Sequence, residues 1–122
     1  MSAVDAHPAL DPATVLIPAV AHFIWFGREL PWANALSIRS AALRGGFEQV
    51  VLHHADDLSG NDVWPELEAL PGFRARRIDE HALIGAIGPG SSQLLEIYQR
   101  LDAPAARANV LRAAILYAEG GV

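Results

Sequence analysis

The residues best suited to binding or chemistry gather in two short segments, one towards each end of the chain. The first runs from Ile17 to Gly27 and sets an imidazole and an indole within an apolar run. The second runs from Ala108 to Arg112 and is followed by Leu-Tyr and then Gly-Gly. Asn109 and Arg112 are three residues apart, so on a helix they share one face. Each segment alone also fits a structural role, as a buried strand with a core His and Trp, or as the solvated face of an Ala-rich helix.

The first half of the chain predicts alternating strands and helices around these segments. Residues 20–26 are almost continuously apolar, which is typical of a strand buried on both faces of a parallel sheet. A helix over 32–44 follows, and Gly45-Gly46 ends it. The remaining elements expected here are a strand over 47–53, a short helix capped by Asp62 and ending at Leu70, and a strand over 73–78 near a sheet edge.

The second half predicts mainly helices. Asp79 is expected to cap a helical turn through Ile87, and residues 88–92 to form a loop. A helix over 93–101 follows, and then Asp102 caps the last helix, which ends at Glu119 before Gly120-Gly121. Residues 1–16 are interrupted by Pro and Asp and predict a loose leader. The whole pattern predicts an α/β layer of parallel strands, with ligands at the carboxyl ends of the strands, near residues 25–27.

Composition excludes several classes of function. Of the 122 residues, 52% are hydrophobic and 19% charged, which permits a folded core. The net charge of −5 and the lack of a dense basic run argue against nucleic acid as a partner. No cysteine is present for disulfides or thiolate metal sites. No apolar run approaches the ~20 residues of a membrane span. We therefore expect a cytoplasmic protein, although a secreted effector with a non-cleaved signal would look the same.

Taken together, the two segments resemble the glycosyltransferase family that has a DXD sugar-binding motif. This family includes mannosyl- and galactosyltransferase-like enzymes and the catalytic domains of the large clostridial glucosylating toxins. Its opening pattern, Ile-Pro and then Ile-His-x-Ile-Trp-x-Gly, is matched here by Ile17, Pro18, His22, Ile24, Trp25 and Gly27. Its later block, Ala-Asp-x-x-Arg and then Leu-Tyr-x-x-Gly-Gly, is matched by Ala108, Arg112, Leu116, Tyr117, Gly120 and Gly121. The resemblance covers residues 17–122 and is weak in the middle.

The resemblance implies a fold, a reaction and a donor site. It implies the N-terminal part of a GT-A, Rossmann-like nucleotide-binding fold, here with three mainly parallel strands and flanking helices. The reaction would transfer a sugar from a UDP- or GDP-sugar to an acceptor hydroxyl with retention of configuration. The nucleotide would contact Ile24, Trp25, Phe26 and Gly27, with the base stacked on the indole. Asn109 and Arg112 would contact the donor sugar or phosphates, since a guanidinium suits such oxygens.

Two departures from the family pattern limit the activity that we expect. Asn109 stands where the family has Asp, and this change keeps a hydrogen-bonding oxygen but removes a charge. The family's Tyr-x-Asp-x-Asp, whose carboxylates hold a Mn²⁺ or Mg²⁺ cofactor at the diphosphate, does not occur before Val122. We assign no catalytic residue and no metal ligand, and we expect this truncated chain to be inactive on its own. The alternative is a non-catalytic α/β binding or interaction module.

Several weaker signals complete the expectations. His53 and His54, with Asp56 and Asp57, could suggest a metal site, but adjacent residues on a strand point to opposite faces. His22 is expected to hydrogen-bond within the fold, and Glu80 to be solvated. We also expect self-association through an exposed sheet edge, and through uncovered apolar surface on the last helix around Leu111, Ile115 and Leu116.

Overall fold

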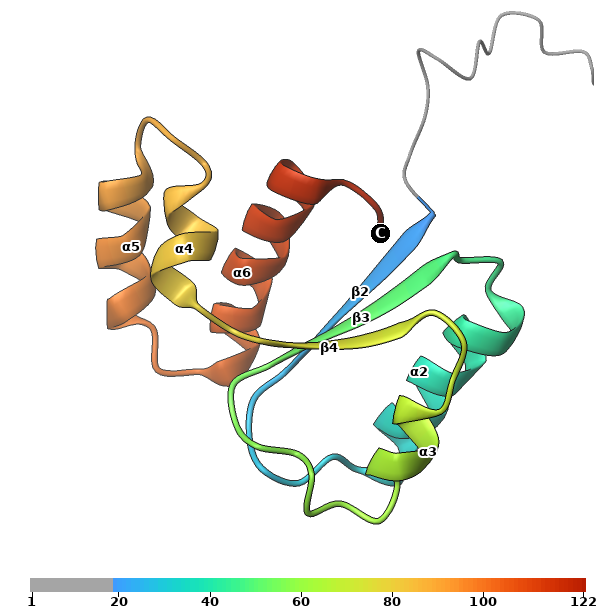
Figure 1. Cartoon of the computed structure of the whole chain (residues 1–122). Helices are drawn as coiled ribbons and strands as arrows, with labels where there is room; N and C mark the ends of the chain where they lie inside the picture. Colours follow the sequence, from blue (N-terminus) through green and yellow to red (C-terminus); the bar gives the residue numbers. More distant parts are fainter. Residues whose placement is uncertain (1–18) are drawn as a thin grey trace, which may run out of the picture.

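The structure, a computed structural model, describes residues 19–122, and at its centre lies a three-stranded parallel sheet. Strands β2 (Val20–Trp25), β3 (Gln49–His54) and β4 (Phe73–Arg77) lie side by side in that order (Figure 1). In the register, Val20 pairs with Gln49, and Val50 with Phe73. The predicted α/β class with three parallel strands is therefore confirmed, while the leader and the Ile17-Pro18 pair lie outside the described residues.

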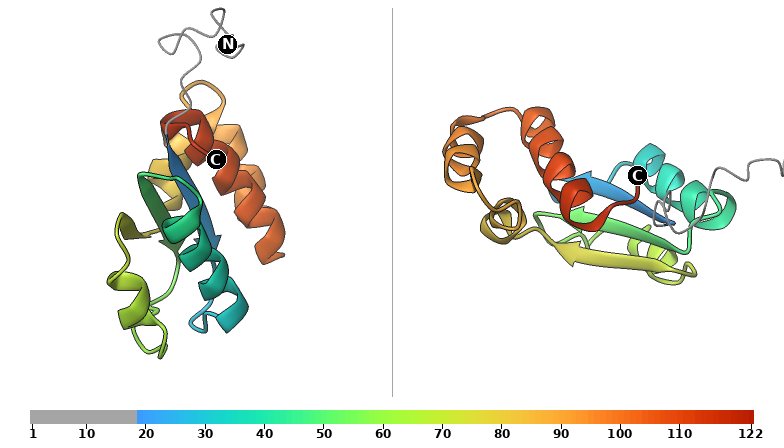
Figure 2. Two further views of the ribbon diagram at one scale, coloured as in Figure 1. Left: turned by 90° about the vertical axis from the view of Figure 1, so that its right-hand side faces the viewer. Right: turned by 90° about the horizontal axis from the view of Figure 1, so that it is seen from above.

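Helices flank the sheet on its two faces and enclose two apolar cores. Helices α2 (Trp32–Arg44) and α3 (Trp64–Glu68) cover a core that includes Val50, Leu52 and Leu58. Helices α4 (Glu80–Gly85), α5 (Ser91–Arg100) and α6 (Pro104–Glu119) enclose the other core. Figure 2 shows the strands between these two groups of helices. None of the helices within residues 19–122 is long and apolar enough to cross a membrane.

Alternation along β2 sends its side chains to both cores. Phe23 and Trp25 pack against the core under α2 and α3. Ile24 and Phe26 pack against the core under α4, α5 and α6. Both faces of the strand are therefore covered, which explains its nearly continuous apolar sequence.

Most element positions agree with the predicted ones. Helix α2 has the expected bounds, because the chain enters from the extended Pro31 and leaves through Gly45 and the left-handed Gly46. Asp79 caps α4 as predicted, and its carboxylate accepts a hydrogen bond from the backbone N–H of Ala82.

Two other predicted caps are wrong. The residue before α3 is Val63, which has helical dihedral angles, so Asp62 lies outside the capping position. The residue before α6 is Ala103 and not Asp102. Ala103 is extended because Pro104 follows it and disfavours the helical region for the preceding residue.

Several element ends differ by a few residues from those predicted. Strand β2 ends one residue earlier, at Trp25, and β3 begins later, at Gln49, because Glu48 turns to bond Ala19. Helix α3 ends at Glu68, before Leu70, and β4 ends at Arg77. Ser91 and Ser92 belong to α5 and not to the preceding loop, because the left-handed Gly90 already turns the chain.

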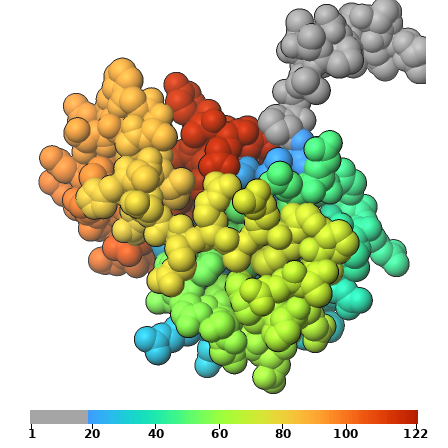
Figure 3. All heavy atoms as spheres, viewed as in Figure 1, coloured from blue at the N-terminus to red at the C-terminus, as the bar shows by residue number. Residues whose placement is uncertain are grey.

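The prediction that the last helix leaves apolar surface uncovered is wrong for Leu111 and Ile115. Leu111 and Ile115 are fully buried, and Leu116 is half-buried. The reason is that α4 and α5 fold back over α6 and bring Ile84 and Tyr98 against Leu111. Strand β4 is the expected edge strand, and Figure 3 shows it (yellow) at the surface between the two groups of helices.

Candidate functional site

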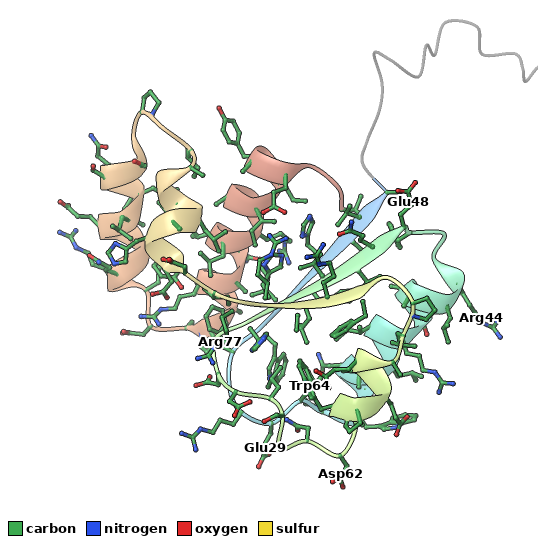
Figure 4. All side chains as sticks on the ribbon, in the orientation of Figure 1. Glu29, Arg44, Glu48, Asp62, Trp64 and Arg77 are labelled. Carbon is green, nitrogen blue, oxygen red and sulfur yellow. The ribbon has the colours of Figure 1, made fainter. Side chains whose placement is uncertain are left out.

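A polar cavity of about 610 Å³ opens at the carboxyl ends of the three strands. The loops that follow β2 and β3 contribute to it, and so does Arg77, the last residue of β4. Its lining consists of Arg28, Glu29, Asp56, Asp57, Ser59, Gly60, Asn61 and Arg77. Figure 4 shows Glu29 and Arg77 towards this end of the sheet, whereas Glu48 lies at the opposite end. Open α/β sheets bind ligands in this position, so the cavity is the candidate site.

Backbone and side-chain bonds join the first two loops of this cavity. The N–H of Gly27 donates to Asp56 Oδ2 at 2.8 Å, and the N–H of Ala55 donates to the carbonyl of Trp25 at 3.2 Å. Gly27 adopts a positive φ of 109°, which an L side chain rarely adopts. The glycine therefore lets the chain turn sharply at the end of β2 and present its amide to the carboxylate.

Asn61 holds the same two loops together further out. Its Oδ1 accepts from the backbone N–H of Leu30 at 2.9 Å, and its Nδ2 donates to the carbonyl of Arg28 at 2.8 Å. A second bond from Nδ2 reaches the carbonyl of Leu58 at 2.9 Å. One side chain thus fixes the relative position of both loops, so the cavity wall is preorganised before any ligand binds.

Five charged side chains line the cavity. The two guanidinium groups belong to Arg28 and Arg77, and the carboxylates to Glu29, Asp56 and Asp57. Arg77 Nη2 donates to the carbonyl of Ala55 at 2.9 Å, which holds this side chain at the cavity. This mixture can bind a ligand that has both anionic groups and hydroxyl or N–H donors.

The carboxylates do not form a site for the divalent cation that the family resemblance implies. Within residues 19–122, no group of three or more His, Cys, Asp or Glu side chains is arranged to hold a metal ion. Asp56 is bonded to Gly27, and Asp57 Oδ1 accepts from the N–H of Ser59 at 3.0 Å. The hydrogen bonds from Ser59 lower the pKa of Asp57. We therefore assign no step that depends on a metal to these residues.

The indole of Trp25 lies beside the cavity and not in its lining. Its Nε1–H donates to the carbonyl of Glu29 at 2.8 Å, which supports the loop that forms one wall. The ring lines a separate hollow of about 170 Å³ against α2, together with Leu30 and Ile38. A contact between this indole and a nucleotide base stays a prediction.

The other predicted donor-binding residues, except Gly27, lie apart from this cavity. Ile24 and Phe26 pack in the core under α4, α5 and α6, and only Gly27 bonds a residue of the cavity lining. Arg112 Nη2 donates to Asn109 Oδ1, and both side chains are exposed on α6. Asn109 lines an apolar hollow of about 440 Å³ with Leu94 and Tyr117 among others. The structure thus brings Asn109 and Arg112 together, but not into the hollows that contain Trp25 or Asp56.

A buried histidine pair connects the sheet to the end of α6. His22 Nε2–H donates to the carbonyl of Gly120 at 3.1 Å, which leaves Nδ1 to accept from His53 Nε2–H at 3.0 Å. The backbone follows the same path, because Val122 N–H bonds Val20 and His22 N–H bonds Val122. The prediction that His22 hydrogen-bonds within the fold is confirmed.

The adjacent histidines of β3 point to opposite faces, as predicted. His54 Nδ1–H donates to the carbonyl of Asp56 at 2.7 Å, and its ring forms a T-shaped contact with the ring of Trp64. Glu80 differs from the prediction, since it is half-buried and accepts from the Tyr98 hydroxyl at 2.5 Å. Burial and this carboxylate raise the pKa of Tyr98.

Sequence reasoning missed most of the cavity lining. The rule that ligands lie at the carboxyl ends of parallel strands could have indicated Asp56 and Arg77, which follow or end their strands. Asn61 carried no such signal, because its role depends on two loops meeting. Comparison with protein-family models, with curated proteins and with solved structures found no match to this chain.

Proposed function

We propose that this chain forms the donor-binding part of a glycosyltransferase and binds a nucleotide diphosphate sugar in the carboxyl-edge cavity. The observation that carries the proposal is the preorganised polar cavity, in which two guanidinium and three carboxylate groups lie together at the strand ends. The family resemblance of the segments around Trp25 and Arg112 supplies the reaction. In that reaction the bond from the anomeric carbon to the diphosphate oxygen breaks and a bond to an acceptor hydroxyl oxygen forms with retention, while the nucleoside diphosphate leaves and the hydroxyl proton is released.

The charged side chains of the cavity match different chemical groups of such a ligand. Arg28 and Arg77 suit the diphosphate, because guanidinium groups bind phosphate oxygens in a fixed geometry. Asp56 and Asp57 suit ribose or sugar hydroxyls, which donate hydrogen bonds to carboxylates. A ligand that is only anionic fits less well, since three carboxylates share the lining with two guanidinium groups.

The proposal predicts that Arg77→Ala weakens UDP binding at least about tenfold, because a charge-assisted hydrogen bond is worth roughly 1.5–3 kcal/mol. Isothermal titration calorimetry of the full chain with UDP measures this change. The matched control is Arg74→Ala, since Arg74 is exposed on the same strand but does not line the cavity. Arg74→Ala should leave the affinity within about twofold of the parent.

Two outcomes would contradict the donor-site proposal. One is equal weakening by Arg77→Ala and Arg74→Ala, which would indicate a general charge effect. The other is binding of inorganic pyrophosphate as tightly as UDP, which would show that the nucleoside contributes nothing.

A non-catalytic binding module is the second candidate. The place of Asn109 favours it, because this residue lacks the charge of the family's carboxylate and lies with Arg112 outside the carboxyl-edge cavity. Because Asn109 lies outside the carboxyl-edge cavity, Asn109→Asp should leave UDP affinity unchanged under both candidates. An increase in UDP affinity for Asn109→Asp would indicate a donor site at α6 and contradict binding in the cavity.

A further inference from the structure

Helix α2 carries an exposed seam that no other part of the described chain covers. Trp32, Leu36, Arg39 and Leu43 follow one another at spacings of four, three and four residues. This spacing is the repeat of a coiled-coil seam. Trp32 is 69% exposed, Leu36 42% and Leu43 52%, whereas Ala35 and Ile38 face the core. The helix therefore has a second, outward apolar face besides the one that holds it to the sheet.

The protein surface is concave on both sides of this seam. A groove of about 330 Å³ lies between α2 and α3, and its far wall includes Val63, Glu66 and Leu70. A second hollow of about 350 Å³ runs along α2 itself, around Ser40 and Arg44. Figure 4 shows Arg44 pointing away from the body of the molecule. A ridge of large side chains beside grooves can insert into an identical surface, as knobs enter holes.

We infer that the α2 seam is a self-association surface, on which a second copy of this chain docks its own α2 in the antiparallel direction. A two-fold axis between Ser37 and Ile38 sets Trp32 opposite the partner subunit's Leu43. The same axis sets Leu36 opposite the partner subunit's Arg39. Each seam residue thus meets another seam residue, as an isologous interface requires.

The charges of the groove are also complementary under this axis. Arg39 and Glu66 line the groove from opposite walls, and neither takes part in an ion pair within residues 19–122. In the antiparallel dimer, the guanidinium of Arg39 lies opposite the partner subunit's Leu36 and can reach the partner subunit's Glu66. One charged residue in an apolar seam also fixes its register, because a shifted pairing would bury that charge without a partner.

The oligomeric state of the full chain tests this inference. Sedimentation analysis over a concentration series should show a reversible dimer for the parent chain. Leu36→Arg should shift it to a monomer, because each new guanidinium would lie opposite the partner subunit's Arg39 in the seam. The matched control Ile97→Arg, at a site 53% exposed on α5, should still form the dimer. Circular dichroism of each variant checks that it is folded.

Cross-linking tests the register of the pair. The chain contains no cysteine, so single cysteines report unambiguously. An equal mixture of Trp32→Cys and Leu43→Cys chains should cross-link with a short bis-maleimide to a mixed dimer, faster than either chain with itself. A monomer at every concentration, a dimer that survives Leu36→Arg, or faster cross-linking of Trp32→Cys with itself would each overturn the antiparallel seam.

Discussion

Replacing Gly72 with alanine should lower the free energy of unfolding by about 3 kcal/mol. Gly72 has a positive φ of 74°, a conformation that costs an L residue about 1–2 kcal/mol. A Cβ there would also lie 2.5 Å from the carbonyl oxygen of Glu48, so the backbone must shift. The shift would weaken the bond from Val50 N–H to the Gly72 carbonyl, which measures 2.9 Å and is worth about 1 kcal/mol.

Gly46 provides the matched control for this prediction. It has a similar positive φ of 76°, but a Cβ there would meet nothing within 4 Å. Gly46→Ala should therefore cost only the conformational term, about 1 kcal/mol. Urea unfolding followed by circular dichroism measures both values. Equal losses for the two variants would show that the close approach of Gly72 to Glu48 contributes nothing to stability.

The second large effect is the dependence of stability on pH. The free energy of unfolding should fall by roughly 2 kcal/mol as the pH falls from 7 to about 4.5, because His53 is protonated in the unfolded chain before it is protonated in the folded protein. Burial, together with the neighbouring His22, Arg76 and His54, lowers the pKa of His53 from 6.5 to about 4. The expected loss is less than this difference in pKa implies, because solvent screening reduces it.

The sign follows from proton binding. Between pH 6.5 and about 4 the unfolded chain binds a proton at His53 that the folded chain does not bind. Stability is therefore complete above pH 6.5 and falls as the pH drops through this window. The geometry agrees, since only 1% of His53 is exposed and burial disfavours the charged ring.

Denaturant unfolding at pH 7 and at pH 4.5 measures this loss. In His53→Gln, whose amide can still donate to His22, the difference between the two pH values should shrink by the same roughly 2 kcal/mol. An NMR titration of the parent should show the His53 ring neutral until the pH approaches 4. A variant that keeps the full pH dependence would assign the effect to other groups.

The sequence predicted helices and strands correctly where neighbouring residues, such as Pro and Gly, determine their ends. Helix α2 lies between Pro31 and two glycines, so its bounds follow from backbone chemistry alone. Asp102 failed as a predicted cap because Pro104 makes Ala103, and not Asp102, the extended residue before α6. Leu111 was misjudged because its burial depends on where α4 and α5 fold, which no local pattern records.

The candidate site was harder to predict because its residues meet only in three dimensions. The sequence indicated the end of β2, and Gly27 does bond a residue of the cavity lining there. It did not indicate Asn61, whose side chain bonds two loops, or the pairing of His22 with His53. That pairing depends on the register of β2 against β3, in which Ile24 and not His22 lies opposite His53.

The most direct test of the proposed function is the response of backbone amide resonances to UDP. In a titration of the isotope-labelled full chain, we predict shifts of the amides of Gly27 and of residues 56–61, because these surround the carboxyl-edge cavity. Amides along α2, such as Leu36, should not move at constant protein concentration. No response at millimolar UDP, or a response confined to α2 or α5, would contradict nucleotide binding in this cavity.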